Sequence, residues 1–332
     1  MYQQRKGIFE KLEAARGSKV LLYVTGDRRG LETQVHPEVL DLFVDHLDRG
    51  VSKRISLVLY TRGGSTLAAW SLVHLIRQFC DRFEVIVPSK AHSAGTLISL
   101  GADAIVMTKQ ATLGPIDPSV NGPLNPQIPG AAPTARFPVS VEAITGYVAF
   151  AKSHIGVSDG ADLTRVLETL AQHVHPLVLG DVYRSRAQIR MLAERLISRQ
   201  VPDKDRTTRI LEFLCSESGS HDYTIYRKEA RDELGLKIEK PDDDQYELIK
   251  GLYDDFAAEL SLSTPFDPAA FLGQNAVAGY ELVRGLIESR EGGSHGFVSR
   301  GELSRHQIPV APGVTQTGIQ DNRTFEGWER RA

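Results

Sequence analysis

The first third of the chain alternates between short, continuous apolar runs and longer stretches with helical periodicity. The apolar runs are rich in β-branched residues, as expected of buried strands. The stretches between them repeat apolar residues every three or four positions, which predicts amphipathic helices. Strands that alternate with helices form parallel sheets with right-handed crossovers, so the pattern predicts an α/β fold. The predicted strands are 19–26, 55–61, 83–88 and 104–107, and the predicted helices are 36–50, 67–80 and 94–103.

The pattern changes in the middle of the chain. Seven prolines fall within residues 111–138, which predicts an irregular loop. From about Ser140 the periodicity becomes mainly helical, whereas the last thirty or so residues are polar and lack a strong period. We therefore expect three parts, the last of them a polar tail that is either mobile or bound to a partner. These parts are a main domain over 1–240, a helical C-terminal extension over 241–301 and the tail over 302–332.

Composition and charge exclude several classes of protein. The chain has 332 residues, of which 41% are apolar, and a formal charge of −3, which gives no reason to expect binding to nucleic acid. Its two cysteines, Cys80 and Cys215, form no metal or redox motif. No apolar run is long enough for a membrane span or a secretory signal, so we expect a cytoplasmic protein. The sequence also has no P-loop, dinucleotide fingerprint or set of metal-ligand spacings, and it predicts no cofactor.

Two loops with unusually small residues follow neighbouring predicted strands. "TRGGST" (61–66) and "SKAHSAGT" (89–96) both lie at carboxyl ends of strands, where ligands bind in parallel sheets, so we expect them to face the same crevice. Gly63 and Gly64 permit positive φ and the close approach of another chain. They can form a simple strand-to-helix turn, or they can direct the Gly64 N–H at a developing oxyanion.

Ser93 starts the predicted helix of the second loop. Its hydroxyl can cap that helix, which is the common role of serine there, or it can act as a nucleophile at the positive end of the helix. In the second case the Ala94 N–H would be another oxyanion donor, while the small residue Gly95 lets two backbones approach closely. The occurrence of Gly-Gly and Ser-Ala-Gly after consecutive strands favours the nucleophile.

Three stretches carry a specific resemblance: "LYTRGGSTLAAWSLVHLI", "VIVPSKAHSAGTLISLGADAIVM" and "ATLGPIDP". They resemble the Clp protease/crotonase superfamily and, more closely, its serine dehydrogenase proteinase (SDH) family of Clp-fold serine proteinases. The resemblance extends from about residue 8 to 240. It implies a spiral of ββα units, a homo-oligomer and a peptide or protein substrate. It also places Ser93 in the nucleophile position and Gly64 and Ala94 in the oxyanion positions.

The general base departs from the pattern of the Clp peptidase subunit. In that relative the triad histidine precedes a Gln-Pro pair, but Ile116 falls at the matching place here and cannot take a proton. The relative's aspartate precedes a Glu-Ala pair by seven residues, and Asp222 keeps that interval. We therefore favour the neighbouring His221 as general base, since imidazole titrates near neutral pH, with Asp222 to orient it.

Lys90 is the rival base, because it lies three residues before Ser93 and because some relatives use a Ser-Lys dyad. A lysine must be buried to lose its proton and act in this way. Lys152, in the helical region after the loop, is a weaker candidate. His92 is expected to be structural, and Asp117 is expected to fix its turn or to line the crevice.

These features predict a serine hydrolase that cleaves peptides through an acyl-enzyme on Ser93. Two alternatives stay open. One is a crotonase-like enzyme that acts on acyl-CoA, in which the same amide groups would stabilise an enolate. The other is an inactive Clp-fold scaffold, which the isoleucine at position 116 suggests.

Overall fold

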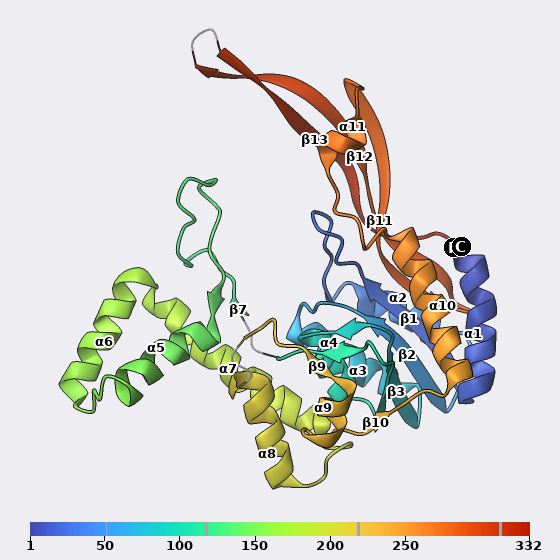
Figure 1. Cartoon of the computed structure of the whole chain (residues 1–332), viewed down its shortest axis with the longest axis horizontal. Helices are drawn as coiled ribbons and strands as arrows, with labels where there is room; N and C mark the ends of the chain where they lie inside the picture. Colours follow the sequence, from blue (N-terminus) through green and yellow to red (C-terminus); the bar gives the residue numbers. More distant parts are fainter. Residues whose placement is uncertain (51, 117–118, 218–219, 312–313) are drawn as a thin grey trace. The chain divides into compact units, whose positions relative to one another are not determined.

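The apolar runs of the sequence form the middle of an eight-stranded sheet (Figure 1). The computed structural model describes residues 1–50, 52–116, 119–217, 220–311 and 314–332. The chain divides into two compact units: the first combines residues 1–113 with 225–332, and the second comprises residues 114–224. The sheet belongs to the first unit, so two distant segments of the sequence fold together to make it.

The sheet joins a parallel half to an antiparallel half. Its parallel strands are β1 (Lys19–Thr25), β2 (Arg54–Tyr60), β3 (Arg82–Val87), β5 (Ala104–Met107) and β10 (Ile238–Glu239). Its antiparallel strands are β11 (Val277–Ser289), β12 (Gly293–Ala311) and β13 (Val314–Arg330). The spatial order is β10-β5-β3-β2-β1-β11-β12-β13. Strand β1 is buried along its whole length, which explains its unbroken apolar sequence, and the predicted α/β fold is confirmed.

A second, small sheet lies at the carboxyl end of the parallel strands. It consists of β4 (Lys90–Ala91), β6 (Thr112–Leu113) and β9 (Ile225–Tyr226). β4 runs parallel to β6, and β6 pairs with β9 in antiparallel register, so that Leu113 lies opposite Ile225. The chain therefore leaves the first unit and re-enters it through two neighbouring strands.

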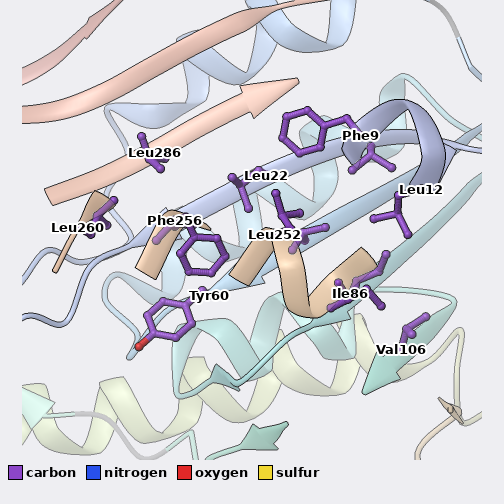
Figure 2. Close-up of a cluster of buried hydrophobic side chains, with 14 residues drawn as sticks. Phe9, Leu12, Leu22, Tyr60, Ile86, Val106, Leu252, Phe256, Leu260 and Leu286 are labelled. Atoms are coloured by element: carbon purple, nitrogen blue, oxygen red, sulfur yellow. The ribbon is translucent and has the colours of Figure 1, made fainter. Parts of the chain in front are cut away.

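Helices α1 (Tyr2–Arg16) and α10 (Asp243–Glu259) cover one face of the large sheet (Figure 2). Phe9 and Leu12 of α1 and Leu252 and Phe256 of α10 pack with Leu22 of β1 in one fully buried cluster. Complete burial of such a side chain stabilises a fold by about 1.5–3 kcal/mol. The cluster thus fixes the N-terminal helix and the C-terminal segment against the same strands.

Other helices of the first unit follow the parallel strands in the sequence, and three of them are α2, α3 and α4. α2 (Val39–Asp48) packs through Phe43 edge-to-face on Tyr23 of β1, with ring centroids 5.3 Å apart. α3 (Thr66–Gln78) begins at Ser65, whose hydroxyl accepts a hydrogen bond from the Ala68 N–H (3.2 Å). α4 (Ala94–Leu100) is buried along its whole length. The two short helices of this unit are α9 (Arg227–Asp232) and α11 (Pro268–Leu272).

The second unit is mainly helical, as the sequence predicts. Its core gathers five valines: Val139, Val141, Val174, Val178 and Val182. The elements are β7 (Ser119–Val120), β8 (Val139–Ser140), α5 (Val141–Ser153), α6 (Gly160–His173), α7 (Pro176–Ile197), α8 (Lys204–Glu212) and a π-helical turn (Phe213–Glu217).

Among the described helices of both units, none has both the length and the apolar character that crossing a membrane requires.

The C-terminal region differs from the expectation of a helical extension over 241–301 and a polar tail over 302–332. The helices end at α11, and the three strands β11 to β13 follow. A tight turn at Gly293, with φ of 85°, reverses the chain between the first two strands. The polar residues fit strands because they pair across the sheet, as Arg300 does with Glu281 (2.7 Å). The expected helical extension therefore ends at Leu272, and the rest of it, together with the expected tail, is corrected to an antiparallel extension of the sheet.

A buried histidine pair joins α2 to this extension. His46 Nε2 lies 2.9 Å from His295 Nδ1, and His46 Nδ1 lies 2.8 Å from Ser289 Oγ. Burial lowers the pKa of His46 to about 3, and the nearby charges of His295 and Lys19 add to the effect. Burial, together with Arg330, also lowers the pKa of His295. Both rings are therefore neutral in the folded protein near neutral pH.

We expect acid to destabilise the fold through this pair. A histidine in the unfolded chain titrates near pH 6.5, so below that pH the unfolded state binds protons that the folded state does not. The free energy of unfolding should therefore fall as pH drops from about 6.5 toward 3, by up to about 1.4 kcal/mol per pH unit for His46. Urea denaturation at several pH values measures the slope. It should be shallower in His46→Gln and unchanged in His36→Gln, which alters an exposed histidine; equal slopes in wild type and His46→Gln would contradict the expectation.

Candidate active site

The glycine pair of the first loop forms an isolated β-bridge with Val35, and we call residues 63–65 the glycine strand. The Val35 N–H donates to the Gly63 carbonyl and the Ser65 N–H donates to the Val35 carbonyl, each at 2.8 Å. Gly63 and Gly64 have φ of 127° and 142°, in the region that favours glycine. A Cβ on Gly64 would lie only 2.5 Å from the Val35 nitrogen. The backbone approach therefore requires glycine, and the Gly64 N–H points to the side of the strand opposite Val35.

Ser93 occupies a strained turn at the start of α4. Its φ of 51° and ψ of −111° are rare for any residue with a side chain. Its carbonyl accepts the Leu97 N–H (3.1 Å) and so begins the helix, but its side chain makes no capping hydrogen bond. Within the part of the chain that the structure describes, the Ser93 hydroxyl has no hydrogen-bond partner. Ser93 is therefore not a side-chain cap, and its half-buried hydroxyl is available for chemistry.

Backbone contacts bring the two loops together at the carboxyl ends of the strands. The His92 N–H donates to the Thr61 carbonyl (3.0 Å), which continues the pairing of the two loops. A Cβ on Gly63 would lie 2.8 Å from the Ser93 Cβ, so the serine side chain lies directly over the glycine backbone. A Cβ on Gly95 would lie 2.5 Å from the Thr61 Cγ2. The small residues at both positions are what permit this contact.

Two backbone amides at this junction have no hydrogen-bond acceptor among the described residues. Neither the Gly64 N–H nor the Ala94 N–H donates a hydrogen bond to another described residue. Ala94 is the first residue of α4, where backbone N–H groups have no partner inside the helix and carry the positive end of the helix dipole. Both groups can therefore donate hydrogen bonds to a negatively charged ligand oxygen.

Lys90 forms an ion pair with Asp27. Its Nζ lies 2.8 Å from Asp27 Oδ2, and the Tyr60 hydroxyl donates to the other oxygen of that carboxylate (2.7 Å). Burial and Asp27 both raise the pKa of Tyr60, so its hydroxyl keeps its proton. These three residues and Tyr253 line a pocket of about 560 Å³ whose lining does not include Ser93. The Lys90 side chain is therefore engaged by Asp27 at the edge of this pocket.

The other predicted site residues lie at different places in the fold. His92, beside the nucleophile, contacts Thr112 Oγ1 through Nε2 (2.8 Å). In the second unit, Ile116 is fully buried and donates its N–H to the Leu214 carbonyl (2.9 Å). Lys152 is exposed in the last turn of α5. Asp117 lies outside the described residues.

His221 and Asp222 are exposed residues of the second unit. His221 lines a pocket of about 540 Å³ together with Glu142, Arg186 and Ser216 of the same unit. The Asp222 N–H donates to the Ser220 hydroxyl (3.1 Å). Their role toward Ser93 stays a prediction.

The sequence did not reveal two residues that shape the first unit's site. Val35 fixes the glycine strand through its backbone alone, and Asp27 holds Lys90 from the end of a different strand. No sequence signal marks either contact, because each joins residues that are far apart in the chain.

The comparison with curated proteins finds uncharacterised relatives. A protein of Methanocaldococcus jannaschii is 29% identical over 187 residues, which is 56% of this chain and 54% of that protein. A second protein of that organism is 39% identical over 66 residues, which is 20% of this chain and 23% of that protein. The chain thus spans about half the length of the first relative and about a quarter of the second.

The comparison with solved structures finds a membrane-bound stomatin-specific protease, 1510-N. Its serine-to-alanine mutant is 16% identical, with a TM-score of 0.39 over 65% of this chain and 79% of that chain. Its lysine-to-alanine mutant in complex with a substrate peptide is 17% identical, with a TM-score of 0.37 over 65% of this chain and 75% of that chain.

The comparison with protein families bears directly on the two loops. The model of the ClpP-like SDH-type serine proteinases matches residues 49–132. This segment contains the glycine strand, the strained turn at Ser93 and the first residues of α4. The resemblance predicted from the motifs around Ser93 is therefore confirmed over this segment: residues 49–132 are similar to the ClpP-like SDH-type serine proteinases.

Proposed function

We propose that this protein is a serine peptidase whose nucleophile is Ser93. The observation that supports this most strongly is the strained backbone of Ser93, which leaves its hydroxyl without a partner among the described residues. Strain of this kind persists only where the surrounding structure imposes it, and it concentrates at functional sites. The family match of the same segment supports the class of reaction. Its substrates would be peptides or proteins, and the family resemblance favours a homo-oligomer.

The two unengaged amides give the proposed mechanism its electrostatic part. The Ser93 Oγ attacks a peptide carbonyl, and the carbonyl oxygen becomes negatively charged between the Gly64 and Ala94 N–H groups. A general base takes the hydroxyl proton and transfers it to the leaving amine, which yields an acyl-enzyme. Water then attacks the ester with the help of the same base and releases the acid.

His221 is the general base in this proposal, with Asp222 as a residue that orients it. Lys90 is less suited to the task, because its side chain is already paired with Asp27 at 2.8 Å. Histidine is the usual general base near neutral pH, because the ordinary pKa of imidazole is close to that pH. His221 is also exposed at a pocket, where a substrate can reach it.

Labelling with a fluorophosphonate probe tests the nucleophile. Such probes phosphonylate activated serines, so the wild-type protein should be labelled and Ser93→Ala should not. Ser198→Ala is the matched control, because Ser198 is an exposed serine whose hydroxyl only donates to the Arg195 carbonyl. Absence of labelling in the wild-type protein, or equal labelling of Ser93→Ala, would overturn the proposal.

The same probe distinguishes the two candidate bases. Loss of a general base costs about 10²–10⁴ in rate, so His221→Ala should be labelled at least about 100-fold more slowly, and added imidazole should restore part of the rate. Lys90→Ala should retain most of it. The reverse order would assign the base to Lys90.

A further inference from the structure

The loop between β1 and α2, residues 26–38, supports the glycine strand of the site. Its residue Val35 makes both backbone hydrogen bonds that fix Gly63 and Ser65. Apart from this contact, the described part of the loop forms no β-bridge and no helix. Contacts that hold the loop in place therefore also hold Val35, and through its two hydrogen bonds they orient the Gly64 N–H.

Arg284 of β11 contacts this loop at its start and in its middle. Its Nε donates to the Leu31 carbonyl (2.9 Å) and its Nη2 donates to the Glu32 carbonyl (2.6 Å). Its own carbonyl accepts the Gly26 N–H (2.8 Å) and the Thr33 hydroxyl (3.0 Å). The guanidinium and the backbone of one residue thus contact four residues of the loop.

The position of Arg284 in the sheet explains how it reaches the loop. The pairing of β11 with β12 shifts register between Val283 and Gly285, so Arg284 is the extra residue of a β-bulge. Bulges redirect side chains and are over-represented beside active sites. Here the bulge turns Arg284 out of the ladder, although its side chain remains only 11% exposed.

The remaining donors of Arg284 are held by the two outer strands. Nη1 donates to the Ser299 hydroxyl of β12 (2.9 Å) and to the Glu326 carboxylate of β13 (2.5 Å). The planar guanidinium can serve two carbonyls and a carboxylate at once, which the single ammonium of a lysine cannot do in the same geometry. Hydrogen bonds therefore link β13 to Arg284 and Arg284 to the 26–38 loop. The backbone of the loop connects these contacts to Val35, which bonds to the glycine strand.

We propose that Arg284 is a positioning residue for the oxyanion-binding amides, and that Glu326 and Ser299 fix it for this role. The inference rests on the proposed function, since it assigns the Gly64 N–H to the oxyanion. Arg284 does not touch the reacting atoms; it acts through the 26–38 loop and Val35. Without it, two loop carbonyls lose their partners and the glycine strand loses its support.

The rate of fluorophosphonate labelling tests the catalytic side of this inference. Removal of one oxyanion donor costs about 10²–10³ in rate, so a misplaced donor in Arg284→Ala should slow labelling by about 10–100-fold. Glu326→Gln should slow it less, and Arg284→Lys should recover only part of the rate. With a peptide substrate the loss should appear in kcat, whereas KM should change little.

Arg300 provides a matched control within the same three strands. It pairs with Glu281 of β11 and Glu329 of β13 and makes no hydrogen bond to the 26–38 loop. Arg300→Ala and Glu329→Gln should therefore label within about twofold of the wild-type rate. Labelling of Arg284→Ala at the wild-type rate would overturn the inference. So would an equal loss in Arg300→Ala, which would indicate a general weakening of the strands.

Hydrogen exchange separates this inference from the proposed function. The amides of Val35 and Ser65 should exchange at least about tenfold faster in Arg284→Ala than in wild type or Arg300→Ala, because their pairing depends on the loop. Unchanged exchange in Arg284→Ala would refute the structural link even if labelling were slow. Faster exchange in a protein whose wild type is never labelled would leave the link standing and refute the peptidase.

Discussion

Replacement of Ser93 by glycine is expected to abolish hydrolysis and to make the protein more stable than Ser93→Ala. Both variants lack the nucleophile, so each should lose activity by about 10³-fold or more. They differ in the backbone, because alanine must keep the φ of 51° that glycine adopts without strain. Strain of this type costs about 1–3 kcal/mol, part of which is offset by the greater freedom of glycine in the unfolded chain. The net expectation is about 1 kcal/mol in favour of Ser93→Gly.

Urea denaturation of the two variants, alongside assays of peptide hydrolysis, measures both effects. Ser99→Gly is a useful control, because Ser99 lies inside α4 and glycine should there destabilise the helix. If Ser93→Gly proved less stable than Ser93→Ala, the positive φ would not be a source of strain. If either variant kept the wild-type activity, Ser93 would not be the nucleophile.

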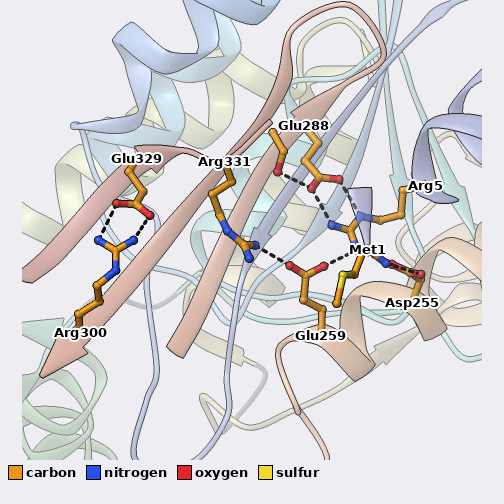
Figure 3. A network of polar contacts seen from close by, with 9 residues as sticks. Met1, Arg5, Asp255, Glu259, Glu288, Arg300, Glu329 and Arg331 are labelled. Atoms are coloured by element: carbon orange, nitrogen blue, oxygen red, sulfur yellow. Dashed lines mark hydrogen bonds and ion pairs between the residues drawn. The ribbon is translucent and has the colours of Figure 1, made fainter. Parts of the chain in front are cut away.

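Removal of the Arg5 side chain is expected to destabilise the first unit by about 3–5 kcal/mol, as is usual when one partner of a buried ion pair is deleted. Arg5 and Glu288 are both inaccessible to solvent and form a bidentate pair, with both bonds at 2.7 Å (Figure 3). Arg5 also contacts Asp255 and, at 2.7 Å, Glu259, both on α10. Arg5→Ala would leave the buried carboxylate of Glu288 without its main countercharge.

The measurement is again urea denaturation, with Arg300→Ala as the exposed counterpart (Figure 3). Arg300 and Glu329 form a similar bidentate pair in contact with solvent, so its loss should have a much smaller effect. The double variant Arg5→Met/Glu288→Leu should recover part of the loss, because it removes both buried charges together. A midpoint for Arg5→Ala that equals that of Arg300→Ala would contradict this account.

The parallel half of the fold could be predicted because its signal is local. The strands β1, β2, β3 and β5 are apolar and almost entirely buried, and α3 between them has an apolar stripe. The C-terminal strands carry no such signal. In β12 and β13 many residues are polar or charged, and they fit strands because their partners lie on the neighbouring strands. Glu281 lies opposite Arg300, and Glu329 forms an ion pair with it. That pairing exists only once the sheet is assembled.

Only part of the candidate site could likewise be predicted from the sequence. The sequence placed Gly64, Ser93 and Ala94 at one edge of the sheet, because consecutive parallel strands end there. It did not anticipate that Asp27 engages Lys90, or that a bulged arginine supports the glycine strand from the far end of the chain. These contacts depend on which side chains meet after folding, and no spacing in the sequence encodes them. The base stays a prediction for the same reason.

The pairing of Leu113 with Ile225 means that residues 114–224 begin and end at facing positions of one small sheet. A change in the length of this segment therefore requires no rearrangement of the strands around it. Because the entropy of closing a loop grows only slowly with its length, a long segment is tolerated there nearly as well as a short turn.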